Sequence, residues 1–410
     1  MQELEAKYGL PRQVAFCQTC IMSNQRPASV VEFKHNSASK KPTLHIDEQG
    51  ICDACRMAEK KEKEIDWKKR EEELLALLDK HRGKYGAYDC IVPGSGGKDS
   101  AYQSHVLKYK YGMNPLTITW PPILYTDYGY KNFRNWIDAG FDNISFNRNG
   151  KVMKLMTRLA IENLLHPFQT FILGQKNLAP KLAANFGIPL IFYGENEAEY
   201  GNPLADNSKS LREKSYFALQ NLDEVYLAGK TIKELKEVHN VSTNDLMAFL
   251  PANLEATEKL NIEVHYLGYY LKWTPQEVYY YAVENTGFQA RPFRTQGTYS
   301  KYNSIDDKID DLHYYTTYIK FGLGRTSYDA SQEIRNHHIT REEAIALAKK
   351  FDGEFPDRYF QEVMDYIEMK PERFHELCDQ FRSPHLWGKD SSGKWKLRHN
   401  VWGGGLDDSI

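Results

Sequence analysis

The sequence predicts an α/β fold: a doubly wound, mostly parallel sheet with an N-terminal zinc ribbon and a helical C-terminal region. Three observations lead to this prediction. Short apolar runs alternate with helical patterns between residues 88 and 193, as is typical of parallel sheets. Two Cys-x-x-Cys pairs lie in the first 56 residues. Beyond residue 300, apolar residues recur mainly at helical spacing.

These patterns divide the chain into four expected parts. They are a zinc-binding ribbon at 1–56, an amphipathic linker helix at 57–86, a sheet domain at 87–290 with an insertion at about 202–260, and a helical region at 291–410 that completes the site. Strands are expected at 88–93, 115–120, 143–146, 188–193 and 263–272, and helices at 101–111, 131–139, 151–165, 179–186, 306–319 and 340–350. A Thr-Pro-x-Glu capping box predicts a further helix start at residue 274.

Composition excludes several classes of protein. The 410 residues are 41% hydrophobic and 26% charged, with a net charge of -2, which is ordinary for a globular protein. This balance gives no reason to expect a long nucleic-acid footprint. No apolar run approaches membrane-spanning length, and the charged N-terminus lacks a signal peptide's apolar core. We therefore expect a cytoplasmic protein.

Four of the six cysteines form two early pairs, Cys17 with Cys20 and Cys52 with Cys55. Four thiolates can close tetrahedrally on zinc and leave no open position for catalysis, so a structural zinc is expected. The 31 residues between the pairs exceed the usual ribbon spacing, which leaves the geometry open. Alternating apolar residues at 29–50 predict two strands around a polar turn at 36–41. Disulfides are rare in cytosolic proteins, and a redox site would need only one pair.

A glycine turn between a predicted strand and helix is the centre of the sequence. It reads Ser95, Gly96, Gly97, Lys98, Asp99 and Ser100. Glycines let the backbone approach a phosphate, and the N–H groups at a helix start favour negative charge. Lys98 would add a cation, and Asp99 could hold magnesium. The spacing is not that of a Walker loop, and the alternative is a turn without a ligand.

Two further segments carry polar groups near glycines. Residues 194–202 follow an apolar strand and include Glu195, Asn196, Glu199 and Tyr200. Because parallel strands end at one edge of a sheet, these residues are expected on the face of Lys98, where they would bind magnesium or a polar substrate. A solvated surface turn is the alternative. Lys320 and Arg325 flank two glycines and could clamp pyrophosphate, or they could simply lie at helix ends.

The hexapeptide at 95–100 matches the loop of the PP-loop ATP pyrophosphatases, which it resembles closely. The synthetase domain of asparagine synthetases carries a similar loop. The fuller resemblance is to the N-acetyl sugar amidotransferase family, which makes acetamidino sugars for lipopolysaccharide O-antigen or nonulosonic acids. Its matching pieces are both cysteine pairs, the loop, His166-Pro167-Phe168, Gly194-Glu195-Asn196, Glu199-Tyr200-Gly201, and the segments 324–329, 333–335 and 352–356.

The resemblance implies that ATP is cleaved to AMP and pyrophosphate. An acetamido oxygen would become adenylated, and ammonia from a separate glutaminase subunit would displace AMP. Neither Cys90 nor Cys378 is flanked by the glycines of a nucleophile elbow, so no glutaminase activity is expected in this chain. The expected catalytic residues are Lys98, Asp99, Glu195, Lys320 and Arg325. ATP would be bound by residues 95–100 with Trp120 and Gly174, the sugar by Glu195, Asn196, Glu199 and Tyr200, and magnesium by Asp99.

Two rival functions come from other classes. Some tRNA-thiolating enzymes also combine a PP-loop with cysteine pairs, but they need a basic RNA surface, which the net charge of -2 does not favour. A non-catalytic scaffold with a dead nucleotide fold is the second, and the intact Lys98, Asp99 and Glu195 argue against it. The sequence does not reveal which sugar would react.

Overall fold

The computed structural model describes residues 4–29, 31–195 and 209–406. Its centre is a five-stranded sheet in which every neighbouring pair of strands is parallel. The strands are β1 (Cys90–Pro93), β2 (Pro115–Thr119), β3 (Asn143–Ser145), β4 (Leu190–Tyr193) and β9 (Glu263–Tyr266), in the spatial order β3-β2-β1-β4-β9. The predicted parallel α/β fold is confirmed.

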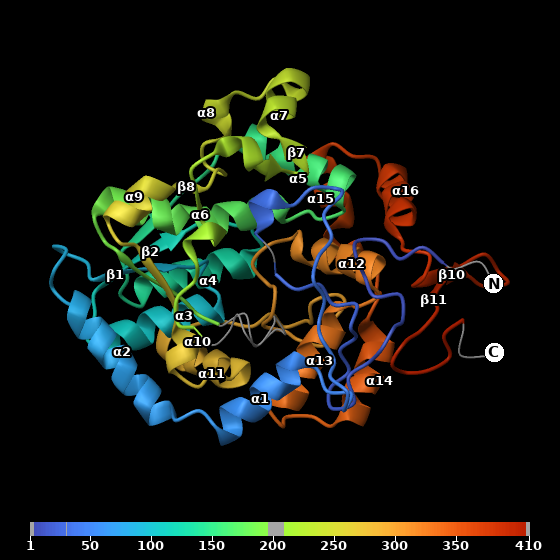
Figure 1. Ribbon diagram of the computed structural model, residues 1–410, viewed down its shortest axis with the longest axis horizontal. Coiled ribbons are helices and arrows are strands. Elements are labelled where there is room, and N and C mark those ends of the chain that lie inside the picture. The colour runs from blue at the N-terminus through green and yellow to red at the C-terminus, as the bar shows by residue number, and fades with distance from the viewer. Residues whose placement is uncertain (1–3, 30, 196–208, 407–410) are drawn as a thin grey trace.

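Helices cover both faces of this sheet (Figure 1). Ile91 of β1 packs into a core with α5 (Gly150–Leu164) and α6 (Gln169–Phe186). Its neighbours Cys90 and Val92 point to the opposite face, into a core built with α2 (Trp67–His81) and α11 (Pro275–Thr286). Because both faces are buried, β1 reads in the sequence as a continuous apolar run rather than an alternating one.

The direction of the strand order reverses between β1 and β4. From β1 the chain proceeds outward through β2 to β3, and it then returns to the other side of β1 for β4 and β9. Ile91 therefore has Leu116 on one side and Ile191 on the other. At such a switch point the loops after the two central strands diverge, and a crevice opens at their carboxyl ends. The glycine loop, residues 95–100, follows β1 at this place, and Glu195 follows β4.

The single linker helix predicted at 57–86 is wrong. The structure has two helices there, α1 (Asp53–Lys63) and α2. Asp66 starts the second one, because its side chain accepts a hydrogen bond from the backbone N–H of Lys69 at 3.1 Å. The buried Lys61 holds the junction to the sheet domain by donating to the Trp273 carbonyl at 3.0 Å.

The two strands predicted within 29–50 are also not formed. The described residues there contain a short 3-10 helix, Glu32–Lys34, and isolated bridges from Pro27 to Thr43 and from Ile46 to Cys52. Glu32 explains the compact turn, because its carboxylate lies 3.3 Å from His35 Nδ1 and 3.5 Å from Lys41 Nζ. Phe33 beside it is buried in the main core.

The C-terminal region is mainly helical, as expected. It comprises α12 (Asp310–Phe321), α13 (Arg325–Arg335), α14 (Arg341–Phe351), α15 (Asp357–Ile367) and α16 (Pro371–Phe381). The predicted capping box at Thr340 is formed with Glu343. The helix α11 does begin at Pro275, but Thr274 makes no side-chain cap there. An antiparallel hairpin, β10 (Trp387–Lys389) with β11 (Trp395–Leu397), was not predicted.

The remaining helices and strands lie around the central sheet. The glycine loop leads into α3 (Lys98–His105), which continues as a π-helical turn (Val106–Lys110), and α4 (Asp127–Asp138) follows β2. Residues 209–260 form short elements that pack on α6, where Asn177 donates to the Phe249 carbonyl at 2.9 Å. They include β5 (Ala218–Leu219), β6 (Tyr226–Leu227), β7 (Lys230–Thr231), α7 (Ile232–His239), α8 (Thr243–Leu246), β8 (Ala252–Asn253) and α9 (Leu254–Lys259), and α10 (Leu267–Tyr270) follows β9.

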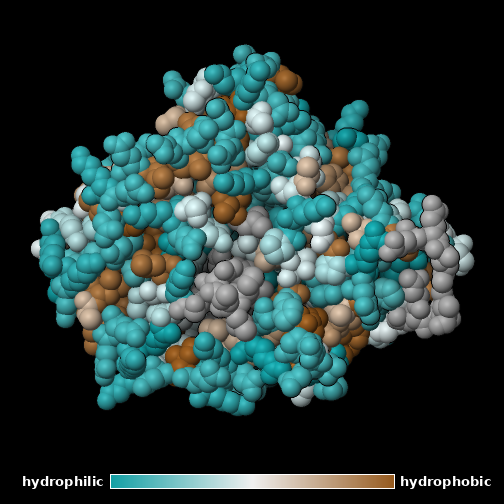
Figure 2. Space-filling model, in the orientation of Figure 1, coloured by the Kyte–Doolittle hydropathy of each residue, from teal (hydrophilic) through white to brown (hydrophobic). Residues whose placement is uncertain are grey.

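Hydrophilic side chains cover much of the face shown in Figure 2, including the projection formed by α7 and α8. Within the described residues, no helix has the length and apolar character needed to cross a membrane.

Candidate active site

The glycine loop has the backbone geometry of a close-approach turn. Gly96 adopts φ +84°, and a Cβ built on it would lie 2.5 Å from the Phe133 Cα. Gly94 is equally constrained, since its Cβ would lie 2.1 Å from Ser100 Cβ. Gly97 precedes the first residue of α3 and has no side chain with which to cap it. The loop thus presents glycine backbone at a helix N-terminus, an arrangement suited to an anion.

A buried cation lies beside this loop. Lys98 Nζ contacts both carboxylate oxygens of Asp99, at 2.8 and 2.7 Å. Burial alone would lower the pKa of Lys98, but the carboxylates of Asp99 and Glu195 raise it above its ordinary value. Lys98 is therefore positively charged at neutral pH. Glu195 is oriented from the other side, because the indole N–H of Trp273 donates to its Oε1 at 3.2 Å.

Two cavities open on either side of the glycine loop. The first has a volume of about 420 Å³ and the second about 360 Å³. Ser95, Gly97, Asp99 and Glu195 belong to the walls of both. A ligand with two parts could therefore lie on each side while its reacting centre sits at the loop.

In the second cavity, the apolar side chains of Ile118, Trp120 and Ala179 lie beside polar ones such as Gln175 and Arg212. Trp120 is stacked on Phe146, with ring centroids 5.8 Å apart and planes within 7°. Gly174 makes room for this indole, because a Cβ at that position would lie 2.1 Å from the Trp120 ring. The structure brings together both residues that were expected near ATP, although Gly174 supports the ring rather than lining the cavity.

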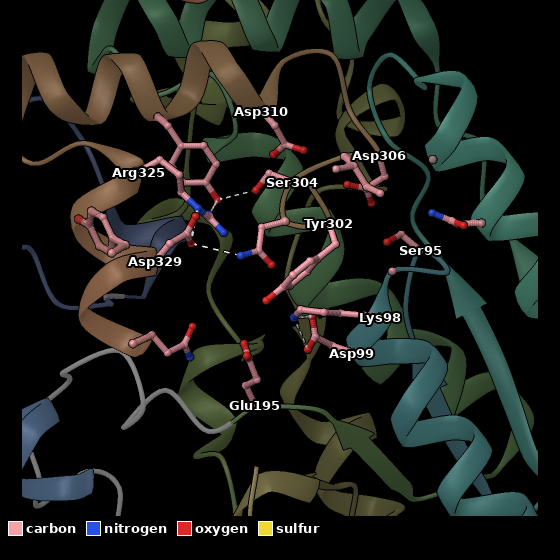
Figure 3. Close-up of a pocket in the computed structure, with 18 of the residues that line it drawn as sticks. Ser95, Lys98, Asp99, Glu195, Tyr302, Ser304, Asp306, Asp310, Arg325 and Asp329 are labelled. Atoms are coloured by element: carbon pink, nitrogen blue, oxygen red, sulfur yellow. Dashed lines mark hydrogen bonds and ion pairs between the residues drawn. The ribbon is translucent and has the colours of Figure 1, made fainter. Parts of the chain in front are cut away.

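The first cavity is polar and is closed by the C-terminal region (Figure 3). Lys98 and Asp99 lie on one wall, and Arg325 and Asp329 face them across the space, with Glu195 below. Arg325 is held by Asp329, whose Oδ1 lies 2.8 Å from its Nε, and it also donates to the Tyr314 hydroxyl. Burial opposes its charge, but Asp329 and Tyr314 raise its pKa. Arg325 is a fixed cation with the orientation of its guanidinium set.

Asp306 and Asp310 supply two carboxyl groups at the end of the first cavity opposite Glu195 (Figure 3). Burial raises the pKa of Asp310 well above its ordinary value, and the neighbouring Asp306 and Asp307 raise it further. The raised pKa favours the protonated carboxyl, which can donate a hydrogen bond to a polar substrate where an ionised carboxylate could only accept one.

Lys320 is the one described catalytic candidate that does not reach this cavity. Its Nζ donates to the Leu164 carbonyl at 2.7 Å, and it lines a third cavity. Burial and the nearby Lys41 lower the pKa of Lys320 to about 7. The structure therefore does not bring Lys320 together with Lys98 and Arg325. Asn196, Glu199 and Tyr200 lie outside the described residues.

The four early cysteines form a compact cluster. All are buried, and their sulfur atoms lie within 4.8 Å of one another. Cys17 and Cys55 sulfurs are 3.9 Å apart, and those of Cys20 and Cys52 are 3.7 Å apart. Zinc–sulfur bonds of about 2.3 Å at tetrahedral angles require a sulfur separation of about 3.8 Å. The cluster can thus hold a zinc ion, although the described residues around it do not form the strands of a regular ribbon.

The cysteine cluster is next to the first cavity. Arg341 of α14 donates to the carbonyl oxygens of Cys20 and Cys17, at 3.2 and 3.3 Å. Met22 and Arg26, two and six residues after Cys20 in the chain, line the first cavity. A metal in the cluster would fix the N-terminal segment against the C-terminal helices, and with it one wall of the cavity.

Sequence reasoning missed several residues of the first cavity. They are Met22, Arg26, Asn132, Tyr302, Asn303, Ser304, Asp306, Asp310, Tyr314, Asp329, Gln332 and Arg335. The run of acids at 306–311 was one sequence signal for this cavity. Its surroundings gave no reason to prefer a binding site to a solvated helix start. Asp329 could have been found as the partner of Arg325, four residues away on one helix face.

Comparison with known proteins gives two partial matches. Residues 296–401 match the family model described as "LPS biosynthesis protein WbpG-like, C-terminal domain". The uncharacterized protein MJ1599 of Methanocaldococcus jannaschii is 38% identical over 85 residues, which cover 20% of this chain and 29% of that protein. The C-terminal region, including Arg325 and Asp329, is thus similar to a lipopolysaccharide biosynthesis domain. That similarity points to an enzyme of polysaccharide biosynthesis.

Proposed function

We propose that this protein is an ATP-dependent amidotransferase that converts the acetamido group of a sugar or sugar nucleotide to an acetamidino group. The observation that carries the proposal is a glycine loop shared by two cavities at the switch point of a parallel sheet. The second cavity has an apolar patch beside Trp120 that suits a base, while the first is lined by charged and polar side chains that suit a sugar. The similarity of residues 296–401 to a lipopolysaccharide biosynthesis domain supports a sugar as the substrate.

ATP is the reactant that this chemistry requires. An amide oxygen is a very poor leaving group, but it departs readily once it is bonded to AMP. In the proposed arrangement the adenine occupies the second cavity beside Trp120, whose indole N–H is buried without a hydrogen-bond partner among the described residues. The triphosphate then lies along the glycine loop, where Lys98 balances its charge. A magnesium ion held by Asp99 would add further positive charge at the phosphates.

The reaction balances in two steps. The acetamido oxygen attacks the α-phosphorus of ATP, and pyrophosphate leaves. Ammonia then bonds to the activated carbon, and the carbon–oxygen bond breaks, so that AMP carries the oxygen away. Of the four hydrogens on amide nitrogen and ammonia, three remain on the amidinium and one is released. Arg325, fixed by Asp329, is the residue that would stabilise charge on the sugar side.

Ammonia is proposed to come from a separate glutaminase. A glutaminase in this chain would need an accessible thiolate. The two cysteines outside the cluster, Cys90 and Cys378, are both buried. Burial raises the pKa of Cys90 far above that of a free thiol and that of Cys378 to about 12. Neither thiol is suited to nucleophilic attack, which also disfavours a thiolation reaction through Cys90.

The test is mass spectrometry of acetamido sugar nucleotides incubated with the protein, ATP, magnesium and an ammonium salt. Replacement of oxygen by NH lowers the product mass by about one unit, and the amidine gains a positive charge near neutral pH. We expect this product in equal amounts with AMP and pyrophosphate, and far less of all three with Lys98→Ala.

Two results would contradict the proposal. Formation of ADP in place of AMP would exclude adenylation. Co-purification of tRNA, with transfer of sulfur to it, would favour the thiolation alternative.

A further inference from the structure

A third cavity lies between the N-terminal segment and α12. Its volume is about 230 Å³, and its wall includes His166, His313, Lys320, Lys41 and Glu32. We call it the histidine cavity. Tyr314 and Tyr328 belong to its wall and also to the wall of the first cavity. Two aromatic side chains therefore separate the histidine cavity from the proposed site of the sugar.

The charged groups of the histidine cavity already have partners. Lys320 donates to the Leu164 carbonyl at 2.7 Å. Lys41 Nζ lies 3.5 Å from Glu32, whose other carboxylate oxygen is 3.3 Å from His35. An incoming anion would compete with Glu32 for Lys41. The charges on the wall are thus satisfied within the protein.

The two imidazoles have no such partners. The rings of His166 and His313 are stacked, with centroids 5.0 Å apart and planes at 23°. The Nδ1 atom of each ring is buried and has no hydrogen-bond partner among the described residues. A buried polar atom without a hydrogen-bond partner is unfavourable in a folded protein. Both residues line the cavity, so a small polar occupant would lie beside the two imidazoles.

The environment selects a neutral occupant. Burial lowers the pKa of His313 to about 3 and that of His166 well below its ordinary value, so both imidazoles are uncharged. A cation entering the cavity would meet Lys41 and Lys320, and the one carboxylate there is already paired. Among the described residues, the only group of three or more His, Cys, Asp or Glu side chains placed to hold a metal is the cysteine cluster.

We propose that the histidine cavity binds ammonia as the neutral molecule and delivers it past Tyr314 and Tyr328 to the first cavity. This inference rests on the proposed function, since only an amidation has a use for ammonia. Ammonium has no lone pair and must lose a proton to solvent before it enters. Neutral ammonia offers three N–H donors and one acceptor, so it can hydrogen-bond to an imidazole in either tautomer. The lone pair then forms the new carbon–nitrogen bond, and AMP leaves with the oxygen.

The decisive experiment uses Thr317, which lines the histidine cavity from α12 and bonds to the His313 carbonyl of its own helix at 3.0 Å. Thr317→Leu fills part of the cavity with a larger side chain and removes no imidazole. Thr317→Val is its matched, nearly isosteric control. Product formation is titrated with ammonium chloride at fixed pH. Exchange of labelled pyrophosphate into ATP, in the presence of the sugar and without ammonium, is measured in parallel.

We expect Thr317→Leu to raise the KM for ammonium at least tenfold while pyrophosphate exchange changes less than twofold, and Thr317→Val to match the wild type in both. His313→Leu should raise the same KM. An unchanged KM in a folded Thr317→Leu and His313→Leu would mean that the cavity holds only water, which overturns the inference. Equal losses of exchange and amidation would assign these residues a merely structural role and overturn it too. Absence of exchange in the wild type would instead contradict the proposed function.

Discussion

At the scale of single residues, Lys98 shows how the site is prepared for phosphate. A lysine this buried loses solvation, and it keeps its charge because Asp99 and Glu195 lie close to it. Asp99 and Glu195 therefore hold the Lys98 cation in position before the substrate arrives. Binding of a triphosphate would then bring further negative charge next to this cation.

Lys98→Ala removes the cation that would stabilise the charge developing on the phosphates. By analogy with the loss of one stabilising donor, AMP formation should fall about 10²–10³-fold. The measurement is AMP released with saturating sugar and ammonium. Lys98→Arg is the matched control, which keeps the charge but not the shape, and it should retain more activity. Normal turnover by a folded Lys98→Ala would remove the loop from the mechanism.

The glycine loop offers a paired test of backbone strain. Gly96→Ala forces a side chain into φ +84° and against the Phe133 backbone. The left-handed conformation alone costs roughly 1–2 kcal/mol, and the clash adds to it. Gly97→Ala is the matched control, because its nearest contact would be Ser95 Oγ at 3.6 Å, and its stability should change by less than about 0.5 kcal/mol. Urea denaturation measures both, and equal midpoints would contradict this account of the loop.

At the scale of elements, sequence patterns predicted the strands and helices that depend on residues close together in the chain. The strands β1, β2 and β4 and the helix α14 arise from contiguous apolar runs and from a capping box that spans four residues. The hairpin β10–β11 was missed because its sequence is rich in Trp, Gly and Lys and lacks regular alternation. In place of the two strands expected at 29–50, the described residues there form a short 3-10 helix, in which Glu32 contacts residues three and nine positions away.

The site could be predicted only where it follows a strand. The glycine loop and Glu195 were found because parallel strands end at one edge. Arg26, Tyr302 and Asp310 reach the same cavity from distant parts of the chain, and no local pattern encodes that convergence. The placement of Lys320 could not be foreseen for the same reason. Its distance from Arg325 in sequence is five residues, but α12 ends between them and turns it to another cavity.

A carboxyl group at the end of α14, which contacts the start of α13, makes stability depend on pH. Asp352 accepts hydrogen bonds from the backbone N–H and hydroxyl of Ser327, at 3.2 and 2.6 Å, yet burial raises its pKa from 3.8 to about 7. A raised pKa in the folded state means that the native protein binds more protons than the unfolded chain. This contribution to stability is present below about pH 4 and is lost as pH rises to about 7.

Asp352→Asn removes this titration and keeps the shape of the side chain. The free energy of unfolding of the wild type should fall relative to that of Asp352→Asn as pH rises from 4 to 7, by at most about 4 kcal/mol. Urea denaturation of both proteins at pH 5 and pH 8 gives the difference. Glu354→Gln is a control for the loss of a nearby carboxylate, because the pKa of Glu354 is lowered by Arg294 and Gly297 despite burial, and it should show the opposite trend. A constant difference for Asp352→Asn contradicts the assignment.

At the scale of the whole molecule, the N-terminal segment is tied into the C-terminal region rather than set apart from it. Its residues run beside α12, α13 and α14 (Figure 1). The Lys7 backbone N–H donates to Ser383 Oγ at 2.9 Å, and the Tyr8 hydroxyl donates to the Phe381 carbonyl at 2.6 Å. The cysteine cluster packs with Leu323 and Tyr328. The N-terminal segment, through Met22 and Arg26, and the C-terminal region therefore form the wall of the first cavity together.

Cys52→Ser tests this coupling. Loss of one thiolate should abolish zinc binding, lower the melting temperature and raise the KM for the sugar, because Met22 and Arg26 would no longer be held in the cavity wall. Cys378→Ser is the matched control, a buried cysteine outside the cluster, which should lose stability but keep its zinc. Metal analysis, thermal denaturation and sugar titration distinguish the two variants. If Cys52→Ser kept its metal, the cluster would be misassigned. If it lost the metal without any change in the KM for the sugar, the N-terminal segment would be a separate module, and the first cavity would be formed by the sheet and the C-terminal helices alone.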